Sequence, residues 1–180
     1  ADADWLTGCE GMHQAAERQG VRAAALGWYG AYSGERGPQA TVVSEGRTFE
    51  DYPPDAERTQ EVVRLLRLPP AQRPRLVLAY FKGPDSAEHF QGADSEAAKA
   101  AARSADAAVA VVLAAIDAMP DRARVALVVT TDHGMLPVTT LVNIRKILAN
   151  HAIPARSLAT GTTALLYFED SAQVTRAEQA

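Results

Sequence analysis

Two pairs of side chains in this sequence could do chemistry together, and each pair consists of an aspartate and a histidine. The pairs are Asp85 with His89 and Asp132 with His133. Each pair comes directly after a run of apolar residues that favours a buried strand. Because open α/β folds keep their chemistry at the carboxyl edge of the sheet, we expect the two pairs to meet there.

The spacing of each pair allows both of its side chains to face one cation. Asp85 and His89 are four positions apart, so one turn of helix or a tight loop places them side by side. Asp132 and His133 are adjacent and need a sharp backbone turn, which Gly134 permits. Taken singly, a pair spaced like Asp85 and His89 is more often a solvated loop aspartate and a surface histidine, and Asp132 with His133 can be a simple turn after a strand. Two such pairs, each at the end of a predicted parallel strand, favour a shared metal site.

The ligand types indicate which metal and which reaction to expect. Carboxylate with imidazole, and no thiolate, suits zinc or another borderline divalent ion better than magnesium, which prefers oxygen ligands alone. Two sets of ligands suggest two ions. A pair of ions about 4 Å apart can clamp a phosphoryl group, so phosphate-ester hydrolysis is the first mechanism to test.

Strands alternate with helices along the chain, which predicts an α/β fold with a mainly parallel sheet. Expected helices cover 12–19, 57–68, about 95–119 and 142–149, and expected strands cover 21–26, 76–81, 125–129 and 164–168. Gly20, Pro69 and Pro120 provide helix ends, and Asp94 or Ser95 provides a helix start. Residues 28–55 are rich in Gly, Pro and aromatics and predict a long loop or lid.

Bulk properties narrow the possible classes of protein. A chain of 180 residues predicts a single domain with a sizeable core. The net charge of -4, without a Lys or Arg run, argues against binding along a nucleic-acid backbone. One cysteine excludes an internal disulfide framework, and no apolar run is long enough to span a bilayer. The first residues lack a secretion-signal pattern, so we expect any such peptide to lie outside this sequence.

Several segments together resemble the type I phosphodiesterase/nucleotide pyrophosphatase family of the alkaline phosphatase superfamily. They are LVLAYFKGPDSAEH, the SADAAV part of the following helix and VALVVTTDHGM, preceded by AAERQGVRAAALGWYG and RLLRLPPAQRPRL. The resemblance covers about residues 4–135 and is weaker beyond. It implies a three-layer α/β/α core of the alkaline phosphatase type, in truncated form.

The resemblance also implies roles for individual residues. Asp85 and His89 would bind one zinc ion, and Asp132 and His133 a second. Trp28 and Phe49 match positions at which relatives hold aromatic side chains beside the nucleotide base. An aromatic residue in a loop is more often a core residue, and that alternative stays open for both.

The sequence departs from the family pattern in ways that bear on activity. Relatives carry a Thr or Ser nucleophile and a further Asp ligand in segments that precede anything present here. They also carry a late His ligand, which His151 does not match. Glu88 stands where relatives have a small residue before the first-motif histidine. We therefore expect a catalytically incomplete fragment with no nucleophile of its own.

The function implied is a two-metal hydrolase of phosphodiester or pyrophosphate bonds in small nucleotide-like substrates. The family further suggests a periplasmic or extracellular protein. Two alternatives stay open: another hydrolase of the superfamily, acting on phosphonate, phospholipid or sulfate esters, and a non-catalytic α/β domain. The oligomeric state does not follow from the sequence.

Overall fold

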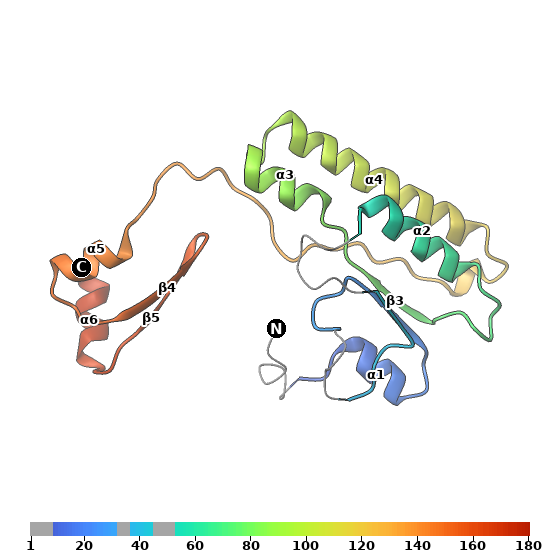
Figure 1. Cartoon of the computed structure of the whole chain (residues 1–180), viewed down its shortest axis with the longest axis horizontal. Coiled ribbons are helices and arrows are strands. Elements are labelled where there is room, and N and C mark those ends of the chain that lie inside the picture. The colour runs from blue at the N-terminus through green and yellow to red at the C-terminus, as the bar shows by residue number, and fades with distance from the viewer. Residues whose placement is uncertain (1–8, 32–36, 45–52) are drawn as a thin grey trace. The chain divides into compact units, whose positions relative to one another are not determined.

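The computed structural model describes residues 9–31, 37–44 and 53–180 (Figure 1). Contacts divide the chain into two compact units, Ala1–Leu136 and Pro137–Ala180, and each is described by itself. The expectation of a single domain stays a prediction, because two compact units can belong to one domain. Within the described ranges, no helix combines the length and apolar character needed to cross a membrane.

A three-stranded parallel sheet forms the centre of the first unit. Its strands are β1 (Ala23–Leu26), β2 (Val42–Ser44) and β3 (Leu76–Ala79), in the order β2-β1-β3. In the register of the sheet, Ala24 pairs with Val42 on one side, and Ala23 pairs with Leu76 on the other. All four residues of β1 are buried, as expected for a central strand covered on both faces.

Helices cover both faces of this sheet. They are α1 (Met12–Arg18), α2 (Asp55–Leu66) and α4 (Glu96–Asp117), which is followed by a 3-10 turn at Arg122–Arg124. The helix α3 (Gly83–Gln91) packs against α4. Because side chains alternate along a strand, Ala23 and Ala25 point to one face, where Ala16 of α1 packs. Ala24 and Leu26 point to the other face and pack with side chains of α2 and α4. The prediction of a three-layer α/β/α fold with a parallel sheet is therefore confirmed (Figure 1).

The local signals for helix ends act largely as the sequence predicts. Gly20 follows α1 with a φ of 72°, the left-handed conformation that glycine adopts most easily. Ser95 caps α4, its hydroxyl accepting a hydrogen bond from the Ala98 N–H at 3.1 Å. The helix predicted to end at Leu68 ends two residues earlier, at Leu66.

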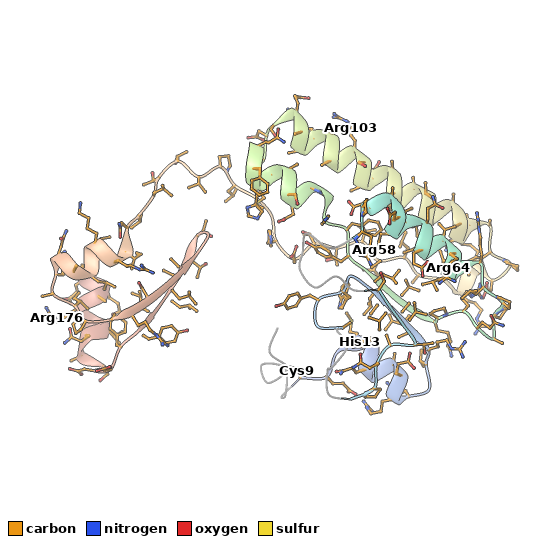
Figure 2. All side chains as sticks on the ribbon, in the orientation of Figure 1. Cys9, His13, Arg58, Arg64, Arg103 and Arg176 are labelled. Atoms are coloured by element: carbon orange, nitrogen blue, oxygen red, sulfur yellow. The ribbon has the colours of Figure 1, made fainter. Side chains whose placement is uncertain are left out.

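Arg58 is a buried residue of α2 (Figure 2) and lies close to the end of β1. Its side chain is 2% exposed, and its guanidinium lies against Gly27 at the end of β1. A Cβ atom at position 27 would lie 2.6 Å from Nη2 of Arg58. Glycine at this position therefore lets the helix and the strand approach closely.

Two expectations for the first unit are wrong. Residues 125–129, predicted as a strand, form no sheet pairing, and beyond Val125 their side chains are exposed, including Val128 and Val129. Their β-favouring composition is not sufficient, because a strand exists only where a neighbouring strand offers its hydrogen bonds. The segment 28–55, predicted as a loop, contains β2, and its residues 32–36 and 45–52 lie outside the described part.

The second unit is a helix, a hairpin and a helix. Its elements are α5 (Ile144–Asn150), β4 (Arg156–Thr160), β5 (Thr163–Tyr167) and α6 (Ala172–Gln179). The helix predicted at 142–149 and the strand predicted at 164–168 are confirmed within two residues. The expectation of parallel pairing is wrong here, because β4 and β5 pair antiparallel. Two residues, beginning with Gly161 at a φ of 53°, connect them, and so short a connection can join only antiparallel strands.

Candidate functional site

Asp85 and His89 lie one turn apart on α3, the helix that follows β3. Pro84 lies in the first turn of this helix. Proline is favoured there because the N–H that it lacks would have no partner within the helix, and because its fixed φ is already helical. Oδ1 of Asp85 and Nε2 of His89 are 3.3 Å apart, and the two side chains are 26% and 58% exposed. Of the two arrangements that the spacing allowed, the helix is the one adopted.

The start of α3 is held by a residue from another helix. The Asp55 carboxylate accepts hydrogen bonds from the N–H groups of Lys82 and Gly83, at 3.1 and 3.0 Å. Sequence reasoning missed this residue. Its only signal was a Pro-Pro-Asp start to a helix, which is also typical of ordinary helix ends.

The Asp132–Gly134 loop is shaped by its own hydrogen bonds. The Thr131 hydroxyl donates to the His133 carbonyl at 2.6 Å, and the Asp132 carboxylate accepts from the His133 N–H at 3.1 Å. Nδ1 of His133 lies 3.2 Å from the Gly134 carbonyl oxygen. This contact is a hydrogen bond in the tautomer that carries the proton on Nδ1, and a neutral ring in that tautomer keeps its lone pair on Nε2.

Asp85 is the point at which the two pairs meet. Nε2 of His133 lies 3.7 Å from Oδ1 of Asp85, and 3.8 Å from Oδ2 of Asp132. These distances exceed those of a hydrogen bond, and the side chains of His133 and Asp132 are 53% and 67% exposed. The fold thus gathers carboxylates and imidazoles from segments more than forty residues apart at one place beyond β3.

The ligand types in this cluster suit zinc, but the side chains are not arranged as a complete metal site. Imidazole nitrogen and carboxylate oxygen are ordinary zinc ligands. In the part of the chain that the structure describes, no three His, Cys, Asp or Glu side chains are placed to hold a metal ion. In the tautomer with the proton on Nδ1, the lone pair on Nε2 of His133 could bind a cation together with Oδ1 of Asp85, which also lies 3.3 Å from Nε2 of His89. The assignment of two zinc ions stays a prediction.

The two aromatic residues expected beside a substrate have different outcomes. Trp28 is half-buried and packs against the cluster of small residues between α1 and the sheet. That contact agrees with the alternative in which it is a core residue, and its role at a substrate stays a prediction. Phe49 lies outside the described residues.

The fold and this cluster together define an α/β protein with Asp and His pairs gathered beyond the end of a parallel sheet. The chain belongs to the type I phosphodiesterase/nucleotide pyrophosphatase family, whose model matches residues 1–179. It is also similar to the ectonucleotide pyrophosphatase/phosphodiesterase family member 3 of Mus musculus, with 30% identity over 131 residues. The matched part covers 73% of this chain and 14% of that protein. The family predicted from the sequence motifs is therefore confirmed.

Proposed function

We propose that the chain forms part of a metal-dependent hydrolase that cleaves phosphodiester or pyrophosphate bonds in nucleotide-like substrates. In this proposal Asp85 and His89 bind one divalent ion, and Asp132 and His133 bind a second, with zinc the metal that suits these ligands best. The observation that carries the proposal is the 3.7 Å approach of the His133 Nε2 to Asp85, which joins the two motifs. Family membership supports the reaction class.

The residues of the chain have distinct tasks in this proposal. The carboxylates of Asp85 and Asp132 supply negative charge to a site that must hold cations. The Gly134 carbonyl fixes the ring of His133 so that Nε2 faces the site, a second contact of the kind that orients ligands in metal centres. When bound, divalent ions polarise the phosphoryl oxygens and lower the pKa of the attacking oxygen.

We assign the nucleophile to no residue of this chain. The expectation from the family pattern, a Thr or Ser in a segment outside these residues, is part of the proposal. The matched part is 14% of the mouse relative, so most of the length of that protein lies outside the comparison.

The test compares the full gene product with alanine variants, using a nitrophenyl nucleotide as substrate. Asp85→Ala and Asp132→Ala should each lower turnover by several orders of magnitude, because losing a carboxylate ligand loosens an ion and misplaces it. Asp106→Ala is the matched control, since it removes an exposed carboxylate from α4. Near-normal turnover by Asp132→Ala would show that the metal assignment is wrong.

Two further measurements define the substrate and the active unit. Phospholipid, phosphonate and sulfate esters in the same assay would reveal a different ester class, if one of them is cleaved faster than the nucleotide. The 180-residue chain, assayed alone, should not exceed the rate of zinc in buffer. Turnover by that chain would contradict its catalytic incompleteness.

A further inference from the structure

We propose that Asp55 is a positioning residue for this site, and that it acts by fixing the first turn of α3. The inference rests on the proposed function, because α3 carries Asp85 and His89. Lys82, the residue before the helix, provides no side-chain cap, and its backbone is already helical in conformation. The helix start therefore depends on a partner from elsewhere in the fold.

Asp55 supplies that partner with both of its oxygens. Oδ1 accepts from the N–H of Lys82 at 3.1 Å, and Oδ2 accepts from the N–H of Gly83 at 3.0 Å. The first N–H groups of a helix have no partner within the helix, and a carboxylate also interacts favourably with the positive end of the helix dipole. A cap is usually the residue next to the helix, whereas this one comes from the first turn of α2.

Gly83 makes this contact possible. A Cβ atom built at position 83 would lie 2.6 Å from Oδ2 of Asp55, closer than real Cβ contacts allow. Any side chain at this position would therefore push the carboxylate away from the helix start. The glycine and the aspartate form one contact, and two independent substitutions can break it.

The backbone of Asp55 is itself held in place. The Thr59 hydroxyl donates to the Asp55 carbonyl at 2.7 Å. The same helix buries Val62 and Leu65 in the core against β1. The carboxylate therefore links a rigid part of the core to the turn between β3 and α3.

The position of this link explains how it would act on the site. Asp85 comes two residues after Gly83, in the first turn of α3, and His89 comes one turn later. A shift at the helix start moves both side chains together relative to His133. Misplacement of reacting groups by about 1 Å can lower a rate by about 100-fold. Asp55 is expected to matter through geometry, without touching the substrate.

The test uses the full gene product and three variants at this contact. Asp55→Ala and Gly83→Ala should each lower kcat by about 10- to 100-fold with little change in KM. Asp55→Asn keeps one acceptor oxygen, so its kcat should lie between that of these variants and that of the unmodified protein. Ser95→Ala is the matched control, since it removes the cap of α4, a helix without site residues.

Two measurements separate positioning from general stability and from the proposed function. Amide exchange in the peptide covering 82–91 should accelerate in Asp55→Ala and stay unchanged in Ser95→Ala. If Asp55→Ala leaves both kcat and this exchange unchanged, or if Ser95→Ala lowers kcat as strongly, the inference is wrong. If the unmodified protein cleaves no phosphodiester, the proposed function fails, while the exchange result still decides whether Asp55 holds α3.

Discussion

Replacing Glu17 with Gln tests the contact that ties α1 to the sheet. Oε1 of Glu17 accepts three hydrogen bonds: from the Ala23 N–H at 2.8 Å, the Thr41 N–H at 2.7 Å and the Thr41 hydroxyl at 2.7 Å. These contacts join the last turn of α1 to the first residue of β1 and to the residue before β2. Hydrogen bonds to a charged group contribute about 1.5–3 kcal/mol each, and neutral ones about 1 kcal/mol. Gln keeps the shape and an acceptor oxygen, and the two bonds from Thr41 are exposed, so they count less than the bond from Ala23. We therefore expect a loss of about 1–3 kcal/mol of unfolding free energy near pH 7.

The pH dependence of this loss follows from the pKa of Glu17. Partial burial acts to raise the pKa, but the hydrogen bonds from Ala23 and Thr41 and the charge of Arg22 outweigh it, so the pKa lies below its ordinary value of 4.5. A carboxyl whose folded-state pKa is lowered stabilises the fold fully above the unfolded pKa. This stabilisation disappears as the pH falls through the folded-state pKa. The difference between the unmodified chain and Glu17→Gln should therefore shrink below about pH 4.5.

Urea unfolding followed by circular dichroism measures this difference across the pH range. Glu10→Gln is the control, because Glu10 pairs with Arg18 at the surface, where water screens the interaction. Its effect at neutral pH should be much smaller than that of Glu17→Gln. A difference for Glu17→Gln that is the same at neutral and acid pH, or absent at neutral pH, would refute the reasoning.

Two further predictions concern the core and the metal. Leu65→Ala should lower the free energy of unfolding by about 2–5 kcal/mol, because the Leu65 side chain of α2 is fully buried against α4 and β1. Leu127→Ala, at a 41% exposed side chain, should lower the free energy of unfolding far less, as measured by urea unfolding of both variants. A similar loss for both would contradict the assignment of the core. Zinc added to the 180-residue chain should bind weakly in calorimetry, since the described residues form no ready set of ligands. Tight stoichiometric binding would show a more complete site.

Local patterns in the sequence were sufficient to predict most elements of the first unit. The end of α1 at Gly20, the cap of α4 at Ser95 and the buried run that forms β1 all depend on neighbouring residues. Such signals act through backbone conformation and periodic burial, which a short stretch of sequence contains in full. The four-residue spacing of Asp85 and His89 belongs to the same class, because one helical turn is enough to bring them together.

Other features depended on partners far away in the chain. Residues 125–129 have strand composition and no strand, because ladder hydrogen bonds need a second strand in register. The antiparallel pairing of β5 depended on β4, a strand whose composition gave no clear signal. Secondary structure of this kind is decided between segments, so the composition of one segment cannot predict it.

The same distinction between local and long-range features holds for the candidate site. Residue types and spacing determined which side chains could bind a metal and which chemistry they suit. Only the tertiary structure brought His133 within 3.7 Å of Asp85 and placed Asp55 at the start of α3. Contacts between residues 27 or 48 positions apart depend on how helices and sheet pack, and packing is a property of the whole core rather than of any local pattern.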